Sequence, residues 1–262
     1  PLAGTFRAGQ SFGVIPPGEN EKGKPHAVRL YSISAPSWGE DGNGNVVSTT
    51  CKRLIDEYSE TDSENHELFV GVCSNYLCDL NVGDEVLVSG PAGKRFLLPV
   101  DTASHDYVFV ATGTGIAPFR GMVTELLENP DGPSSSEIHL VIGVPYGTDL
   151  MYDDWFSKLA EDHSNFHYHT VISRPEVGRR MYVDQYIVET EDPFHRVLAN
   201  DRTLLYICGI EGMQVGIYRL LQTLGVAGDY LRLPEDPVDL ENADHATIKR
   251  IKPGERCMVE VY

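Results

Sequence analysis

The sequence predicts a two-domain protein, in which a small antiparallel β-barrel is followed by an α/β domain with a five-stranded parallel sheet. Before about residue 100, short stretches rich in β-branched and aromatic residues are separated by Gly, Pro, Asn and Asp clusters, which is typical of antiparallel strands. Further on, strand-length apolar runs alternate with helix-length segments, which favours a parallel sheet covered on both faces. We therefore expect domains over residues 1–100 and 101–262.

The first half supplies the expected barrel strands and one short helix. The strands are expected in QSFGVIP, VRLYSIS, NVVSTTCKRL, HELFVGV and DEVLVSG. The helix is expected in CSNYLCDL, where its amino terminus could point at a ligand.

The second half supplies four strand–helix pairs and a final strand. DYVFVA precedes GTGIAPFRGMVTELLE, IHLVIGV precedes DLMYDDWFSKLAED, FHYHTVI precedes MYVDQYIVE, and TLLYICG precedes EGMQVGIYRLLQTLG. Residues 225–256 are rich in Pro and Asp without a clear period, so we expect a surface insertion there. The chain then ends in CMVEVY, whose alternation has the period of a strand.

Charge and cysteine content exclude several classes of protein. The 39 acidic and 21 basic residues give a net charge of −18, which argues against nucleic acid or an anionic membrane as a partner. No apolar run is long enough to span a bilayer and the first residues show no secretion signal, so we expect a cytoplasmic protein, or a stromal one if it is plastidic. The 5 cysteines include no CxxC pair and no Cys/His pair at zinc spacing, so we expect free thiols and predict no metal.

A Gly-rich turn follows the first strand of the expected parallel sheet. Gly113, Thr114 and Gly115 lie between a buried-type strand and a helix, where backbone N–H groups can meet a pyrophosphate, although a purely structural turn has the same pattern. Cys208 and Gly209 end a second strand of the same sheet. Because ligands bind at the carboxyl ends of parallel strands, both ends are expected to meet at one crevice.

The barrel strand RLYS presents Arg29 and Tyr31 on one face and Leu30 and Ser32 on the other. An Arg beside a Tyr could hold a phosphate next to an aromatic platform. An exposed edge strand with a cross-strand pair would look the same.

Six segments in one order make the chain resemble the plant-type ferredoxin–NADP reductases of plastids and cyanobacteria. These are RLYS, GVCSNYLCDL, GPAGK, ATGTGIAPFRG, CGIEGM and the terminal VEVY. The resemblance implies a barrel that binds FAD, an α/β domain that binds NADP(H), and hydride transfer at flavin N5. It also implies a one-electron carrier, ferredoxin or flavodoxin, as partner. The family's opening segment with the first barrel strand is missing, so we expect a trimmed chain or a barrel that closes differently.

The resemblance assigns residues to FAD. Arg29 would reach the pyrophosphate, Tyr31 and Tyr262 would pack on opposite faces of the isoalloxazine, and Ser32 would lie near N5. Cys51 and Lys52 would lie near the adenosine. The full expected set is Arg29, Leu30, Tyr31, Ser32, Cys51, Lys52, Gly71, Val72, Cys73, Ser74, Thr114 and Tyr262.

The resemblance also assigns residues to NADP(H). Lys94, Thr114 and Arg120 would hold phosphates, and Cys208 would lie beside the reacting carbon. Asp184 stands where the family has a Gln that faces the adenine. A carboxylate there would repel a 2′-phosphate or favour a ribose hydroxyl. We expect NADP(H) as the nucleotide, with NADH left open. The full expected set is Lys94, Thr114, Gly115, Arg120, Ser173, Arg174, Arg180, Tyr182, Asp184, Cys208 and Gly209.

Four residues are expected to take part in the reaction itself: Ser32, Cys208, Glu260 and Tyr262. Ser32 and Glu260 would relay the N5 proton, and the ring of Tyr262 would act as a movable lid where nicotinamide must stack.

The segment IKRIKPGER is the candidate docking patch for an acidic carrier, although a solvated loop is the simpler interpretation. Its basic residues are Lys249, Arg250, Lys252 and Arg256. Two other classes stay open: a reductase module of a multicomponent oxygenase using NAD(P)H, and a non-catalytic flavin sensor.

Overall fold

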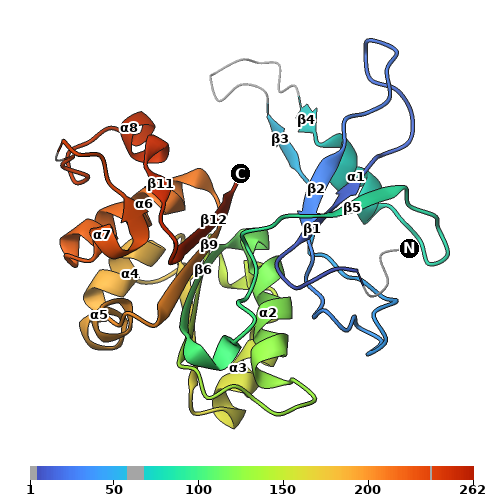
Figure 1. Cartoon of the computed structure of the whole chain (residues 1–262). Coiled ribbons are helices and arrows are strands. Elements are labelled where there is room, and N and C mark those ends of the chain that lie inside the picture. The colour runs from blue at the N-terminus through green and yellow to red at the C-terminus, as the bar shows by residue number, and fades with distance from the viewer. Residues whose placement is uncertain (1–4, 58–67, 237) are drawn as a thin grey trace.

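The computed structural model describes residues 5–57, 68–236 and 238–262 and contains two lobes (Figure 1). The amino-terminal lobe has an antiparallel sheet in the order β2-β1-β5 and a separate pair, β3-β4. Its elements are β1 (Ser11–Val14), β2 (Arg29–Ser32), β3 (Ile55–Glu57), β4 (Leu68–Val70), α1 (Val72–Cys78) and β5 (Val88–Ala92). A small core of buried apolar side chains, including Phe12, Ile33 and Cys73, holds this lobe together.

The second lobe is built on a parallel sheet of five strands in the order β12-β9-β6-β7-β8. The strands are β6 (Asp106–Thr112), β7 (Ile138–Val144), β8 (Phe166–Ile172), β9 (Thr203–Gly209) and β12 (Cys257–Val261). The inner strands β6, β7 and β9 are largely apolar because both faces of the sheet are covered there, whereas the edge strands β8 and β12 carry polar side chains as well. The fold class predicted from the sequence is confirmed.

Helices cover both faces of the parallel sheet (Figure 1). On one face lie α2 (Ala117–Leu127) and α3 (Asp153–Asp162), together with Phe96 and Leu98 from the segment that joins the lobes. On the other face lie α4 (Val183–Glu189), α5 (Glu191–Leu198), α6 (Glu211–Thr223), α7 (Ala227–Tyr230) and α8 (His245–Arg250). Short 3₁₀ turns are η1 (Thr102–Ser104), η2 (Gly113–Ile116) and η3 (Gly147–Asp149). Within the described ranges, no helix combines the length and apolar character needed to cross a membrane.

Two stretches differ from the sequence-based expectation. Residues 45–54 form no strand; Thr49 makes one isolated bridge to Ile33, and β3 begins only at Ile55. Residues 225–256 are no loose insertion, because α7, β10 (Leu231–Arg232), α8 and β11 (Lys252–Pro253) order them and Leu240 and Ile248 are fully buried. Arg219 fixes this stretch by donating to the carbonyl oxygens of Leu240 and Ala243 at 3.1 and 2.9 Å.

The two lobes are joined by polar contacts around α2. The Ser37 backbone N–H donates to the Glu125 carboxylate at 2.6 Å, and the hydroxyls of Thr50 and Tyr152 are 2.7 Å apart. The backbones also approach closely, since a Cβ on Gly121 would lie 2.5 Å from the Ala35 carbonyl oxygen. These contacts hold the amino-terminal lobe against the α/β lobe at a defined place.

Candidate active site

The carboxyl ends of β6 and β9 are packed directly against each other. A Cβ on Gly115 would collide with the carbonyl oxygen of Cys208, and one on Gly209, whose φ is +146°, would collide with the Thr112 hydroxyl. That hydroxyl oxygen accepts from the Ile210 N–H at 3.0 Å. The convergence expected for Gly113–Gly115 and Cys208–Gly209 is present. Thr112 was not foreseen, although a hydroxyl residue just before a Gly turn is a usable signal.

The terminal strand places its last three residues on this crevice. In the parallel register of β12 and β9, Glu260 lies opposite Cys208 and the Tyr262 N–H donates to the Gly209 carbonyl oxygen at 2.9 Å. The hydroxyls of Tyr262 and Thr114 are 2.7 Å apart. Tyr262 is thus held over the Gly-rich turn, yet it is 65% exposed.

Glu260 lies where the amino-terminal lobe touches the terminal strand. A Cβ on Gly93, just after β5, would lie 3.8 Å from the Glu260 Oε1 atom. Glu260 lines a cavity of about 210 Å³ whose other lining residues are Lys94, Arg95, Phe96, Pro253 and Val259. Burial raises the pKa of the Glu260 carboxyl to about 7. Its neighbour Cys208 is buried too, and burial together with the charge of Glu260 raises the pKa of that thiol. The pair therefore offers a titratable acid beside a neutral thiol.

The strand RLYS forms β2, as predicted. Tyr31 packs against the core of the amino-terminal lobe and contacts Cys73, and burial raises the pKa of its hydroxyl. Arg29 is exposed and makes only long contacts, at 3.5 and 3.3 Å, to carbonyl oxygens two and one residues before it. Within residues 5–57, 68–236 and 238–262, its guanidinium forms no ion pair with a carboxylate. Among the described residues, no hydrogen bond joins Ser32 to Glu260, Cys208 or Tyr262; the Ser32 carbonyl oxygen accepts from Thr49 at 2.8 Å.

The surface around β2 and α1 suits a flat, partly apolar ligand. Large apolar side chains stay exposed there; they include Leu30, Leu54, Val70 and Val72, with Leu30 64% exposed. Helix α1 begins after Gly71 without a side-chain cap. The Ser74 hydroxyl is engaged with Gly71 and Leu54, at 3.3 and 3.2 Å. The residues present therefore fit an aromatic dinucleotide such as FAD.

Cys51 contacts the carboxyl end of α1, and Lys52 contacts the α/β lobe. The Cys51 sulfur is 3.8 Å from that of Cys78, the last residue of α1, and the Lys52 ammonium is 3.9 Å from the Asp149 carboxylate. These contacts give the expected adenosine role of the pair no support.

The residues expected at a 2′-phosphate lie just after β8 and at the start of α4. The backbone N–H groups of Ser173 and Arg174 donate to the carbonyl oxygens of Val144 and Pro145, each at 2.8 Å. The side chain of Arg174 is exposed. Arg180 stacks over the Tyr182 ring at 4.7 Å from its centroid. Asp184 is turned toward α6, where a Cβ on Gly216 would lie 2.9 Å from its carboxyl carbon. The expectation that Asp184 faces the adenine is not supported.

Arg120 has a different place from the one expected. Its guanidinium donates to the Ser34 carbonyl oxygen at 3.0 Å and forms an ion pair with Glu40, and it lies over the Tyr152 ring. A cation with these partners joins the two lobes and is not free to meet a phosphate. Of the residues expected at the phosphates, Thr114 lies at the crevice and Lys94 beside Glu260.

The fold and site define a two-domain oxidoreductase that binds a dinucleotide at the carboxyl ends of a parallel sheet. Residues 109–218 match the family model of the oxidoreductase NAD-binding domain. The chain is 36% identical over 263 residues to the cyanelle ferredoxin–NADP reductase of Cyanophora paradoxa, covering 98% of this chain and 68% of that one. It is 37% identical over 264 residues to the chloroplastic leaf isozyme 1 of Arabidopsis thaliana, with the same coverage. The chain belongs to the ferredoxin–NADP reductase family.

Solved structures agree with this fold. The ferredoxin–NADP⁺ reductase of Plasmodium falciparum superposes with a TM-score of 0.69 at 24% identity, covering 98% of this chain and 84% of that one. A variant of the same protein with 2′P-AMP gives a TM-score of 0.70 at 23% identity.

Proposed function

We propose that this chain is an FAD-dependent oxidoreductase that exchanges electrons between a one-electron carrier and NADP(H). The observation that carries the proposal is the terminal strand, which brings Glu260 and Tyr262 to the place where the amino-terminal lobe meets the carboxyl ends of the parallel strands. Residues 1–100 would bind FAD and residues 101–262 would bind NADP(H). Reduction of the bound FAD by NADPH in the purified chain is the direct test.

FAD, when bound, supplies the conversion between single-electron and hydride transfer. The chain's own residues supply position and protons. Tyr31 would support one face of the ring, and Tyr262 would occupy the other until nicotinamide displaces it. Glu260, half-buried and with a pKa near neutrality, would hold a proton close to the reacting atoms. The neutral thiol of Cys208 would contact the nicotinamide without adding charge. Ser32 on β2 is proposed as the hydroxyl near N5.

The 2′-phosphate would be bound by Ser173, Arg174, Arg180 and Tyr182, which combine two cations with two hydroxyls. Asp184 does not oppose this because it is turned toward α6. We therefore propose NADP(H) over NADH.

Replacing Arg174 by Ala is expected to raise the Kd for NADPH roughly 10–100-fold, because a charge-assisted hydrogen bond to phosphate is lost. The Kd for NADH, which lacks the phosphate, should stay within about twofold. Titration of the purified protein with both nucleotides measures this. Arg179→Ala is the matched control, since Arg179 lies in the same loop but pairs with Glu189. If Arg174→Ala weakens the binding of NADPH and NADH equally, Arg174 does not bind the 2′-phosphate.

Ferredoxin or flavodoxin is the proposed carrier, and the basic segment before β12 is its proposed docking surface. The structure narrows the patch. Lys249 forms an ion pair with Glu211, and Arg256 donates to the carbonyl oxygens of Thr203 and Asn200, so Arg256 serves the fold. Arg250 and Lys252 stay exposed, and Lys252 adjoins Pro253 of the cavity that contains Glu260.

Charge reversal of Lys252 to Glu is expected to lower the rate constant for carrier reduction by about tenfold at low salt, because this step depends on attraction to an acidic partner. Added salt should slow carrier reduction by the parent protein and leave NADPH-dependent ferricyanide reduction unchanged. Stopped-flow traces across a salt series measure both rates. Lys22→Glu makes the same charge change on the loop between β1 and β2, far along the chain from the patch. If neither added salt nor Lys252→Glu changes the rate of carrier reduction, the proposal that this segment is the docking surface is wrong.

A further inference from the structure

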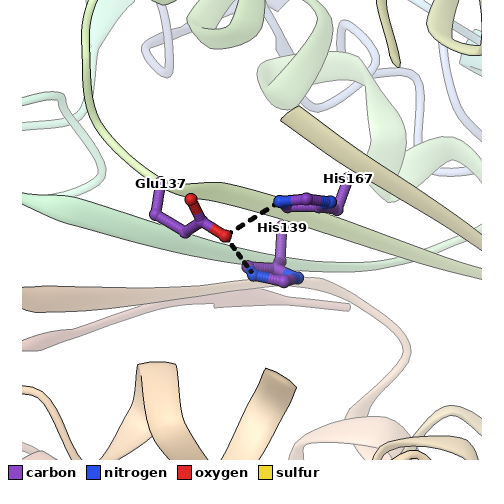
Figure 2. A group of neighbouring side chains, drawn as sticks. All are labelled: Glu137, His139 and His167. Atoms are coloured by element: carbon purple, nitrogen blue, oxygen red, sulfur yellow. Dashed lines mark hydrogen bonds and ion pairs between the residues drawn. The ribbon is translucent and has the colours of Figure 1, made fainter. Parts of the chain in front are cut away.

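Four ionisable side chains lie together at the amino-terminal ends of β7 and β8, away from the carboxyl ends that form the candidate active site. His139 lies directly opposite His167 in the parallel register, His169 follows two residues later on the edge strand β8, and Glu137 immediately precedes β7. Figure 2 shows the Glu137 carboxylate between one nitrogen of each of two imidazole rings. We propose that Glu137, His139 and His167 bind a divalent transition-metal ion, with zinc as the ion that best suits the set.

The candidate ligand atoms lie close enough together for a zinc site to form after a small rearrangement. The Glu137 Oε1 atom is 2.8 Å from His167 Nε2 and 3.5 Å from His139 Nε2. The candidate ligand atoms all lie within 4.8 Å of one another. Bonds of ~2.0–2.1 Å at tetrahedral angles place ligand atoms roughly 3.3 Å apart. A small rearrangement therefore suffices.

The ring that has to turn is that of His167, which is more exposed than His139. The rings of His139 and His167 are stacked, with centroids 4.5 Å apart and planes inclined by 25°, so one of them must turn for both nitrogens to face a single ion. The His139 side chain is 2% exposed and fixed, whereas His167 is 37% exposed. Glu137 is 39% exposed, so an ion can enter from solvent between these two residues. Three protein ligands would leave a fourth position for water.

A second layer of contacts supports a metal at His139. His139 Nδ1 lies 3.4 Å from His169 Nε2, and His169 Nδ1 lies 3.0 Å from the Tyr186 hydroxyl on α4. A metal on His139 Nε2 puts the ring proton on Nδ1, which then donates to His169, which in turn donates to the Tyr186 oxygen. Metal-bound histidines are commonly oriented by such a partner. Without a metal the same chain can run in either direction.

The rings of His139 and His169 are also held in place by an aromatic side chain. Both pack against Phe194 of α5, with centroids 5.1 and 5.0 Å away. An ion here would tie the edge strand to the rest of the sheet, which gives it a stabilising role distinct from nucleotide binding.

The test is calorimetric titration of the metal-free 262-residue chain with Zn²⁺, together with thermal unfolding in zinc and in chelator. We expect the parent protein to bind one zinc ion, and its Tm to rise by about 5 °C or more when free zinc exceeds the Kd about 100-fold. His167→Ala and Glu137→Ala should each weaken zinc binding by more than tenfold. His169→Phe, which keeps a ring but removes the acceptor, should weaken it about tenfold.

Two control variants define the outcome that would overturn the proposal. His245→Ala removes an exposed histidine from α8, and Cys78→Ser breaks up the thiol pair with Cys51, which is the competing zinc ligand set. Neither should change the affinity of the site. No zinc binding by the parent, unchanged affinity in His167→Ala and Glu137→Ala, or a loss confined to Cys78→Ser would each overturn it. Melting in chelator shows that the variants are folded.

Discussion

Glu260→Gln slows hydride transfer between the flavin and NADP(H) by about 100-fold while FAD stays bound; this is the largest effect we expect. The size is the low end of the range for a positioned acid–base group. Among the described residues, Glu260 is the one acid that lines the cavity between Lys94 and Val259, and it lies opposite Cys208 in the strand register. Gln keeps the shape and hydrogen-bonding capacity of the side chain but cannot hold or release a proton.

Stopped-flow absorbance measures this rate, and flavin content per chain measures retention of FAD. Glu255→Gln is the matched control, because Glu255 is an exposed acid in the same terminal segment and should have no effect. A Glu260→Gln protein with the parent's rate would remove Glu260 from the mechanism. One that loses FAD would assign it a structural role.

The same residue gives the reaction a pH dependence. Burial raises the pKa of Glu260 to about 7 from an ordinary value of 4.5, so the protonated fraction falls as the pH rises from 6 to 8. A step that uses this proton should slow over that range in the parent and stay flat in Glu260→Gln. The folded chain binds the extra proton between pH 4.5 and 7, so the contribution of Glu260 to the free energy of unfolding falls as the pH rises through that window.

Tyr262→Ser is expected to tighten nucleotide binding about tenfold and to narrow the preference for NADPH over NADH. The ring of Tyr262 would occupy the position of nicotinamide, and its hydroxyl is 2.7 Å from that of Thr114. Nicotinamide must displace both contacts before it can stack, and an aromatic contact of this kind contributes up to about 1.5 kcal/mol. Ser removes that competition, so binding depends less on the 2′-phosphate.

Tyr262→Phe separates the ring from the hydrogen bond, because it keeps stacking and loses only the contact to Thr114. Its nucleotide affinity should lie much closer to the parent's than that of Tyr262→Ser. Dissociation constants for NADP⁺ and NAD⁺ across the three proteins measure this. Unchanged affinity and unchanged preference in Tyr262→Ser would show that the ring is no lid.

Local patterns were enough to predict much of the fold. The alternation of VEVY predicted the terminal strand, and the change from turn-rich to alternating strand and helix predicted two lobes. These predictions succeed because each rests on a period or a turn within a few residues. The segment 45–54 misled because its β-branched residues resemble a strand, whereas only Thr49 finds a bridge partner.

Long-range contacts explain what the sequence could not predict. Arg120 was expected at a phosphate, but its partner Glu40 comes from the other lobe, and no spacing reveals such a pair. Asp184 turns toward α6 because Gly216 leaves room for it. The histidine cluster joins residues near 138 and 168, which meet only because β7 and β8 are neighbours in register. Residue types indicate the chemistry, but the topology decides which of them meet.

Anaerobic stopped-flow reduction of the FAD-loaded protein, with NADPH and NADH side by side, tests the central claim most directly. The flavin absorbance should bleach with NADPH in a single-turnover phase, and the NADH reaction should need a much higher nucleotide concentration for the same rate. A chain that retains no FAD, or whose flavin stays oxidised with both nucleotides, would contradict the proposed function.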